Sequence, residues 1–460
     1  METRTEKDSL GDVLVPANKL WGAQTERSFE NFKIGTEKMP KEIIKAFALL
    51  KKATAEANFL LGKMSEEKNS AIKTACDFLL NDGLSDEFPL SVWQTGSGTQ
   101  TNMNVNEVIA NFSNKLTGKK LLHPNDDVNM SQSSNDTFPS ALHIAAILTV
   151  HEKLLPAVDK LISTLGMLQE RYKDTLKCGR THLQDAVPMT FGQEISGWYN
   201  ALSIDRDNVE RSLNGLHSLP IGGTAVGTGL NAPEEFGSAV SMVISQWTNR
   251  PFRVAFNKFQ SLSFRNDITF SHGAIRTLAC DMMKIANDVR WLASGPRTGL
   301  GEITIPANEP GSSIMPGKVN PTQCEAVTMV AVQVMGNDTT ISFACSQGNL
   351  QLNVFLPVIA YNYLQSVTLL SDVIESFDKN CISGLKANEA KMRENVDKSL
   401  MLVTALNPYI GYENAAKVAK YAFDNDKTLK EACVELGFLS SEKFDEVFHP
   451  EKMANPKLNG

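Results

Sequence analysis

The sequence predicts a mostly α-helical fold that contains unusually long helices. Apolar residues recur at three- and four-residue steps over many parts of the chain. The alternation of apolar and polar residues that marks a half-buried strand is scarce. One helical pattern, from Asp136 to Tyr172, is much longer than an average globular helix. Helices of this length on one chain indicate a helix bundle.

The helical patterns follow one another along most of the chain. The first covers 43–64, and the longest covers 136–172. In the longest, Pro139 fits a first helical turn, whereas Pro156 predicts a kink or a break. Further patterns of the same kind occupy 192–213, 266–294, 321–345 and 354–379.

Two segments bear on assembly and domain organisation. The helix predicted at 326–345 is apolar on most sides over its first half, so it needs partners on several faces. That pattern favours an oligomer. The segment after about residue 390 begins with charged residues and ends in "HPEKMANPKLNG", which predicts a small C-terminal unit with an exposed tail.

Composition and charge narrow the class of protein. The chain has 460 residues, with 42% hydrophobic and 21% charged residues, as in ordinary soluble globular proteins. A net charge of −7 argues against a protein that binds nucleic acid through its bulk charge. A local cationic pocket remains compatible with that charge, because net charge does not describe any single site.

Cysteine usage and the first residues indicate the compartment. The seven cysteines form no CxxC pair, which disfavours a zinc ribbon or an iron–sulfur loop and suggests reduced thiols. The start, "METRTEKDSLGD", resembles neither a secretory signal nor a transit peptide. No uninterrupted apolar run approaches the roughly 18 residues that span a bilayer. We therefore expect a cytoplasmic protein with no membrane or nucleic-acid partner.

Four polar stretches interrupt or open the helices. They are "TGSGTQTNMN" (95–104), "HPNDDVNMSQSSNDT" (123–137), "GRTHLQD" (179–185) and "GSSIMPGKVN" (311–320). In the last, Gly311 and Gly317 permit backbone conformations that expose amides, and Lys318 adds a positive charge. The positive end of the next helix faces the same loop. This composition suits an anion-binding loop, but it also suits an ordinary surface turn.

The first two stretches have a simpler reading as helix caps. Small polar residues before a helix most often accept hydrogen bonds from its free amides, and less often bind a ligand. The candidate caps are Thr99, Asn102 and Asn104 in the first stretch and Ser134, Asn135 and Asp136 in the second.

The histidines and one glycine-rich segment need separate treatment. His182 lies in a polar segment, and its ordinary pKa suits proton transfer near neutrality, although a lone histidine is more often structural. His143 and His151 lie eight residues apart on a helical pattern, and we expect them to be structural or exposed. The segment 220–231, "PIGGTAVGTGLN", lacks both nucleotide-binding signatures, so we expect no dinucleotide site there.

Taken together and in this order, the loops resemble those of the fumarase/aspartase superfamily of lyases. "GSSIMPGKVNP" is similar to the superfamily's signature, and the resemblance extends from "WGAQTERSFENFKIG" (21–35) to "NPYIGYENAAKVAK" (407–420). The resemblance implies an N-terminal domain over 1–133, a central long-helix bundle over 134–389 and a small C-terminal domain over 390–460. It also implies a homotetramer in which three subunits meet at each active site.

Three local features separate the branches of this superfamily. Aspartate ammonia-lyases typically carry glutamine where this chain has His182, and often alanine where it has Gly317. The segment 132–139, "QSSNDTFP", also differs from theirs. All three features resemble the class II, iron-independent fumarases. The resemblance implies reversible anti hydration of fumarate to (S)-malate in the tricarboxylic acid cycle, through an aci-carboxylate intermediate, with no cofactor and no metal.

The resemblance also assigns roles to residues. It implies that Ser312 is the base that takes the carbon-bound proton, that His182 acts on the leaving oxygen through water, and that Glu325 orients His182. The residues implied to bind the substrate carboxylates are Ser97, Gly98, Thr99, Ser133, Ser134, Asn135, Thr181, Ser313, Lys318, Val319 and Asn320. The alternatives are an aspartate ammonia-lyase and a catalytically silent structural homologue.

A second dicarboxylate site is implied near residue 123. Its residues are Lys120, His123, Pro124, Asn125 and Asp126. The resemblance leads us to expect a basic residue such as arginine at the first of these positions. Lysine does not form the same fork-shaped contact with a carboxylate, so the affinity of this site is open.

Overall fold

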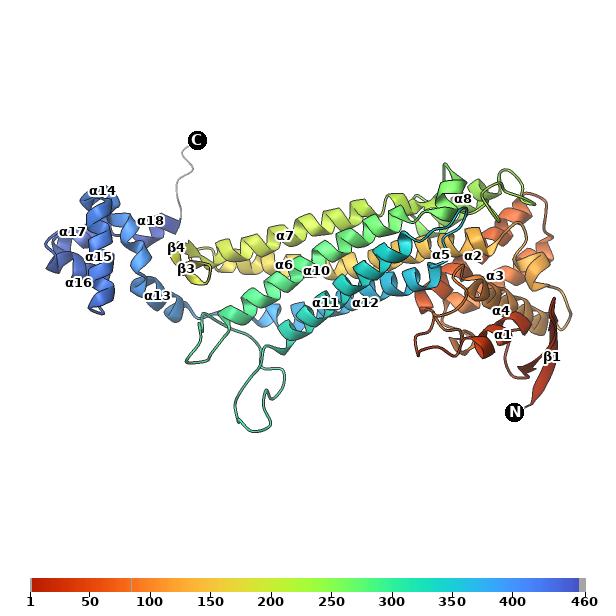
Figure 1. The fold of residues 1–460 in the computed structure, drawn as a ribbon, viewed down its shortest axis with the longest axis horizontal. Helices are drawn as coiled ribbons and strands as arrows, with labels where there is room; N and C mark the ends of the chain where they lie inside the picture. The colour runs from red at the N-terminus through yellow and green to blue at the C-terminus, as the bar shows by residue number, and fades with distance from the viewer. Residues whose placement is uncertain (1, 84, 455–460) are drawn as a thin grey trace. The chain divides into compact units, whose positions relative to one another are not determined.

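The computed structural model describes residues 2–83 and 85–454 (Figure 1). Within these residues the protein is mostly α-helical, as predicted, with four small two-stranded sheets. The chain divides into two compact units. The first comprises Met1–Pro156, Asp205–Ala279 and Val330–Ser371; the second comprises Ala157–Ile204, Cys280–Met329 and Asp372–Gly460. The three-domain division stays a prediction.

The first unit holds the N-terminal elements. A hairpin of β1 (Thr3–Asp8) and β2 (Gly11–Pro16) precedes the helices, and a short parallel pair joins β5 (Ser218–Leu219) to β6 (Arg253–Val254). The helices that lie wholly in this unit are α1 (Ala23–Asn31), α2 (Lys41–Leu60), α3 (Glu66–Leu80), α4 (Thr99–Thr117), α5 (Ser134–Thr149), α8 (Phe236–Thr248) and α9 (Lys258–Ser263). Short turns of helix are η1 (Ser85–Glu87), η2 (Pro124–Val128), η3 (Val150–Leu154) and η4 (Gly215–His217).

The second unit holds two antiparallel pairs and the C-terminal helices. The strand pairs are β3 (Leu176–Thr181) with β4 (Gln184–Thr190), and β7 (Ile303–Thr304) with β8 (Lys386–Ala387). The helices are η5 (Ile382–Gly384), α13 (Glu389–Lys398), η6 (Leu400–Leu406), α14 (Asn407–Ile410), α15 (Tyr412–Asp424), α16 (Leu429–Glu435), α17 (Ser441–Val447) and α18 (Pro450–Ala454). An apolar cluster from Val396 to Phe444 packs the C-terminal helices on one another.

The long helices predicted from periodicity are all present. They are α6 (Leu155–Arg171), α7 (Phe191–Ser212), α10 (Asn266–Leu292), α11 (Thr322–Cys345) and α12 (Leu356–Asn380). The bounds of the last four agree with the predicted patterns to within a few residues, because many successive turns of the helical repeat define each pattern.

The longest predicted helix is present, but it differs from the prediction at one of its two prolines. α5, the π-helical turn η3 and α6 follow one another without interruption from Ser134 to Arg171. The irregularity predicted at Pro156 is the π-helical turn η3. In an ordinary α-helix the Pro156 ring would clash with the carbonyl of Glu152, and the wider turn of η3 relieves that clash. The placement of Pro139 in a first turn was wrong, because the helix begins at Ser134 and Pro139 lies inside it.

The same run, Ser134–Arg171, is long and apolar enough to cross a membrane by length and composition alone. However, 67% of its most apolar window is buried inside the protein, as in the core helix of a globular fold. Its partner α2 contributes Phe47, whose ring lies 5.7 Å from that of Phe138 in an edge-on contact. Burial against other helices therefore accounts for its composition.

His143 is structural, as expected. Its ring is buried, and Nδ1 lies 3.1 Å from the carbonyl oxygens of Leu216 and Ser218. Burial, with a smaller contribution from the charge of Arg265, lowers the pKa of His143 to about 3.

This burial predicts an acid-sensitive contribution to stability. A depressed folded-state pKa stabilises the fold above the unfolded value near 6.5, and that contribution is lost as the pH falls toward 3. We expect the wild type to lose about 2 kcal/mol relative to His143→Gln between pH 6.5 and 5. Urea unfolding of both proteins at the two pH values measures this difference. A parallel change in both proteins would contradict the assignment.

Candidate active site

The loop at 311–321 is closed by hydrogen bonds within the loop, and two of its backbone amides point at Ser312. The Gly311 amide donates to the Lys318 carbonyl over 2.8 Å, and the Asn320 side-chain amide donates to the Gly311 carbonyl over 2.7 Å. Ser312 Oγ accepts hydrogen bonds from the amides of Ile314 (3.3 Å) and Met315 (3.0 Å). Two donors aimed at one hydroxyl oxygen stabilise negative charge on that oxygen.

Glycines set the shape of this loop. Gly317 has a φ of +81°, which favours glycine, and a Cβ at Gly311 would lie 2.5 Å from the Lys318 carbonyl oxygen. The loop borders a cavity of about 470 Å³. Its lining residues are Ala307, Asn308, Glu309, Pro310, Ser312, Met315, Pro316, Gly317, Lys318 and Val319.

Charged groups flank the loop. Lys318 is exposed, and it forms no ion pair within residues 2–83 and 85–454. Glu325 lies half-buried in the first turn of α11, where a carboxylate interacts favourably with the positive end of the helix. In the described part of one chain, no hydrogen bond joins Glu325 to His182.

His182 lies at the tip of a β-hairpin, and not in a loop between helices as the sequence suggested. His182 (φ +56°) and Leu183 (φ +60°) form the two-residue turn between β3 and β4. Both values are typical of the tight hairpin turn that matches the twist of the strands. Thr181 and His182 are exposed in the single chain.

The first two polar stretches lie side by side in the first unit. Asn102 of α4 donates a hydrogen bond to Ser134 Oγ of α5 over 3.0 Å. A Cβ at Gly98 would lie 2.0 Å from the ring of Phe138, so the backbone of the first loop touches α5. Ser97 Oγ and Thr99 Oγ1 are hydrogen-bonded to each other at 2.8 Å. The structure thus groups 97–99 with 133–135.

The predicted helix caps were wrong in detail. α4 is preceded by Gly98 in a left-handed conformation (φ +70°), with no side-chain cap. α5 is capped by Ser133, which forms a reciprocal capping box with Asp136. Ser134 and Asn135 lie inside the helix, and Asn135 Nδ2 donates to the Ala225 carbonyl oxygen over 2.8 Å. The predicted start of α5 therefore lay one or more residues too late, because several adjacent residues are of types that can cap a helix.

Two ionisable groups beside these loops are buried: Lys51 was not predicted as a site residue, and Asp136 was predicted only as a candidate cap. Lys51 of α2 is fully buried, and its Nζ donates to Asn129 Oδ1 (3.0 Å) and Gln132 Oε1 (2.9 Å). Burial lowers the pKa of Lys51 to about 7. Burial raises the pKa of Asp136 to about 7, against hydrogen bonds from the Ser133, Thr224 and Gly222 amides. The burial of Lys51 could have been predicted from its position, because it lies four residues after Phe47 on the apolar side of α2.

The residues proposed for a second dicarboxylate site gather on one short turn. His123 caps the π-helical turn η2, and its Nδ1 accepts from the Asp126 amide over 3.2 Å. The same nitrogen lies 3.3 Å from Asp126 Oδ2. His123, Asn125, Asp126 and Lys120 are exposed, whereas Pro124 is half-buried.

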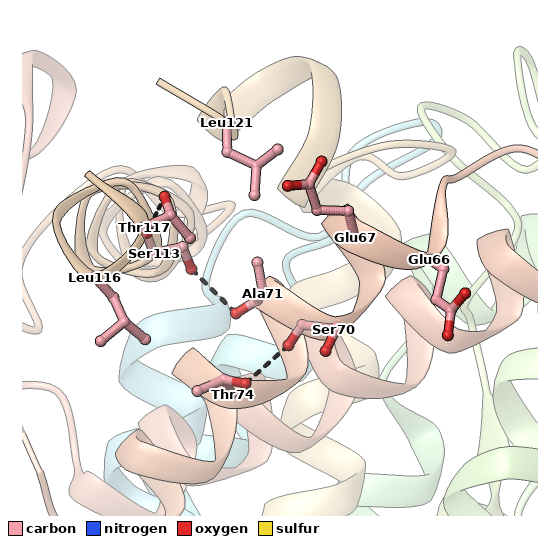
Figure 2. A pocket seen from close by; sticks show the side chains of 9 residues that line it. All are labelled: Glu66, Glu67, Ser70, Ala71, Thr74, Ser113, Leu116, Thr117 and Leu121. Atoms are coloured by element: carbon pink, nitrogen blue, oxygen red, sulfur yellow. Dashed lines mark hydrogen bonds between the residues drawn. The ribbon is translucent and has the colours of Figure 1, made fainter. Parts of the chain in front are cut away.

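A nearby cavity of about 500 Å³ between α3 and α4 has the wrong charge for a dicarboxylate (Figure 2). It is lined by Glu66 and Glu67, whose carboxylates would repel a second anion. The hydroxyls of Ser113 and Thr74 donate to backbone carbonyls of α3, as the dashed lines in Figure 2 show. We therefore assign no substrate to this cavity.

The two glycines that flank α4 provide a matched pair of variants. Gly98 (φ +70°) and Gly118 (φ +69°) share a conformation, but only at Gly98 would a Cβ meet another group. We expect Gly118→Ala to cost about 1–2 kcal/mol through backbone strain. Gly98→Ala should cost about 1–3 kcal/mol more because of Phe138. Urea unfolding measures both, and equal losses would contradict the close contact.

Comparisons with known proteins agree with this geometry. Residues 11–336 match the lyase family, and residues 402–455 match the fumarase C C-terminus family. A class II fumarate hydratase of Oceanobacillus iheyensis is 61% identical, with 99% of this chain and 100% of that protein covered. The chain belongs to the class II fumarate hydratase family. Its membership in the fumarase/aspartase superfamily, predicted from the loops, is therefore confirmed, and so is the prediction of a hydro-lyase.

Other class II fumarate hydratases extend the similarity. The Bacillus subtilis protein is 58% identical over 99% of this chain and all of its own length. A crystal structure of class II fumarase from Schistosoma mansoni superposes with a TM-score of 0.96 at 43% identity, covering 99% of this chain and 100% of that one. The fumarate hydratase fold therefore extends over nearly the whole chain.

Proposed function

We propose that this fumarate hydratase interconverts fumarate and (S)-malate by reversible anti addition of water, in the tricarboxylic acid cycle of the cytoplasm. The observation that carries the residue assignment is the pair of amides from Ile314 and Met315 that point at Ser312 Oγ. Serine is a weak base unless its alkoxide is stabilised, and these donors supply that stabilisation.

In the direction from malate, the first step removes a weakly acidic proton from the carbon beside a carboxylate. Ser312 takes this proton, and the product is an aci-carboxylate that carries extra negative charge. Lys318 and the positive end of α11 face that charge, and Asn320 and the Val319 amide bind the same carboxylate. The aci-carboxylate then collapses and the carbon–oxygen bond breaks, while His182, which Glu325 orients, donates a proton through a bound water so that the hydroxyl group leaves as water.

Most of the proposed substrate donors are uncharged. They are Ser97, Gly98 and Thr99 in the first loop, Ser133, Ser134 and Asn135 at the start of α5, Thr181 in the hairpin, and Ser313 in the 311–321 loop. Neutral donors strengthen their contacts as charge develops in the transition state, without binding the ground-state dianion too tightly.

We propose that the loops come together in a homotetramer, with three subunits at each active site. The exposure of Thr181 and His182 in one chain supports this, because a proton-transfer group needs a partially closed pocket. The long helices of the first unit also expose apolar side chains. Phe270 is 71% exposed, Val332 61% and Phe343 69%, on α10 and α11. Such faces are typical of subunit interfaces.

We also propose that the small dicarboxylate binds a second time at His123, Pro124, Asn125 and Asp126, with Lys120 as the nearby cation. The three-domain division and the cytoplasmic location are also proposed, and each has one supporting observation. The three-domain division is supported by the separate apolar cluster of the C-terminal helices. The cytoplasmic location is supported by seven cysteines without a disulfide.

The proposed reaction is tested by adding purified protein to malate and following fumarate by its ultraviolet absorbance. We expect turnover with malate and none with aspartate. Turnover with aspartate but not malate would replace the proposal with the ammonia-lyase alternative. Turnover with neither would favour a silent homologue of the same fold.

A further inference from the structure

A buried carboxylate holds the base of the hairpin that carries His182. The Glu302 side chain is fully buried, and its Oε1 accepts from Arg180 Nη2 (2.7 Å) and Asn395 Nδ2 (2.8 Å). Its Oε2 lies 3.4 Å from Lys177 Nζ. Burial raises the pKa of Glu302, but the hydrogen bond from Arg180 and the charge of Lys177 outweigh it, so the pKa lies below its usual value. Glu302 is therefore an ionised anchor for Arg180, which lies two residues before His182 in the hairpin.

The hairpin needs such an anchor. Its register shifts between Cys178 and Arg180, around Gly179, where a Cβ would lie 2.8 Å from the Val187 carbonyl oxygen. A bulge of this kind redirects the side chains that follow it. The turn itself places His182 and Leu183 at positive φ, a conformation that persists in ordinary residues only when the surroundings hold it.

Glu302 also belongs to a fixed part of the backbone. Its amide donates to the Leu292 carbonyl over 2.9 Å, and its carbonyl accepts from the Asn388 amide over 2.8 Å. The next residue, Ile303, pairs with Ala387 in the β7–β8 sheet. The backbone of Glu302 is thus fixed at the start of the strand that leads to the 311–321 loop and by Asn388, the N-cap of α13.

We propose that Glu302 is a positioning residue of the hydration reaction, which fixes Thr181 and His182 through Arg180 without touching the substrate. The inference rests on the proposed function, because it assumes that His182 acts on the leaving oxygen. Arg180 and Glu302 set the direction of the hairpin tip, and the proton-transfer geometry follows from that direction.

A second ion pair, between Lys177 of the same hairpin and Glu194 of α7, provides a matched control. Lys177 Nζ donates to Glu194 Oε2 over 2.8 Å, and the Lys177 side chain is only 2% exposed. Glu194→Gln and Glu302→Gln each remove one carboxylate charge from a buried cation. Of these two carboxylates, Glu302 and not Glu194 is joined to Arg180, next to the tip.

The test compares Glu302→Gln, Arg180→Lys and Glu194→Gln in the assembled enzyme. We expect Glu302→Gln and Arg180→Lys to lower kcat for malate by about a hundredfold, with a much smaller change in KM, as expected for a misplaced group. The limb of the pH–kcat profile that His182 governs should shift in both. Glu194→Gln should lower Tm but keep kcat within about twofold of the wild type, because it leaves the reacting geometry intact.

A double variant separates positioning from folding. Glu302→Gln leaves the charge of Arg180 without its carboxylate partner. Replacing both residues, as Glu302→Leu with Arg180→Met, removes that charge and should restore Tm. We expect its kcat to stay low, because the fork that orients the tip is gone. A wild-type kcat and pH profile in Glu302→Gln, or in the folded double variant, would overturn the inference.

The failure of this inference is distinct from that of the proposed function. If Ser312→Ala and His182→Asn leave turnover unchanged, the residue assignment is wrong whatever Glu302 does. If those two variants lose turnover while Glu302→Gln keeps it, only the positioning role fails.

Discussion

Ser312→Ala is expected to lower kcat for malate by about 10²- to 10⁴-fold, the contribution typical of a positioned general base. The variant removes the oxygen toward which the amides of Ile314 and Met315 point, so no group remains there to hold the abstracted proton. The fold should be unaffected, because both hydrogen bonds lie within an exposed loop. Fumarate absorbance gives the rate, and unfolding by heat checks the fold.

Ser313→Ala is the matched control for this variant. Ser313 is the neighbouring serine on the same exposed loop, and its proposed role is to donate one hydrogen bond to a carboxylate. The loss of one such bond costs about 0.5–1.5 kcal/mol, which would raise KM by no more than about tenfold. Near-normal turnover in Ser312→Ala would exclude Ser312 as the base. An equal loss in both variants would indicate a disturbed loop.

Val332→Asp is expected to dissociate the assembly and with it to abolish activity. Val332 is exposed on α11 in the single chain and shares the outer side of the first unit's helices with Phe343. If these side chains are buried between subunits, each new carboxylate would be buried without a partner, at a cost on the order of 3–5 kcal/mol. Symmetry repeats this cost in every subunit. Light scattering measures the mass, and the malate assay measures activity.

Leu116→Asp is the control for the interface variant. Leu116 is 63% exposed on α4, nearly the same as Val332, but it lines the cavity between α3 and α4 and does not belong to α10 or α11. We expect Leu116→Asp to keep both mass and turnover. An active Val332→Asp protein with the mass of a single chain would disprove the shared active site. Dilution of the wild type should reproduce the loss of activity, because an active site shared by subunits disappears with the assembly.

The long helices were predictable because their signal is repeated. In 43–64, 192–213, 266–294 and 354–379, each turn places apolar residues on the same side, so one misjudged position changes little. The helix ends were harder. Ser133, and not its neighbours, caps α5, and Gly98 precedes α4 without a side-chain cap, because such choices depend on single hydrogen bonds.

The hairpin at His182 shows a different limit. Its two strands are short, and their pairing depends on positive φ angles at His182 and Leu183, residues that rarely adopt them. Nothing in "GRTHLQD" distinguishes this turn from a loop between helices. Lys51 and Glu302 are a further case. Each is a charged residue that sequence places by default in solvent, and only the packed helices show that it is buried.

The sequence by itself determined the helical class, the family and the chemical character of the loops, since these depend on residue types and on spacing along the chain. Only the tertiary structure decided which loops touch, where the amides point and which charges lose their water. Those properties arise from contacts between segments far apart in sequence, such as Asn102 with Ser134 and Arg180 with Glu302. Their energies depend on burial and direction, which no local pattern encodes.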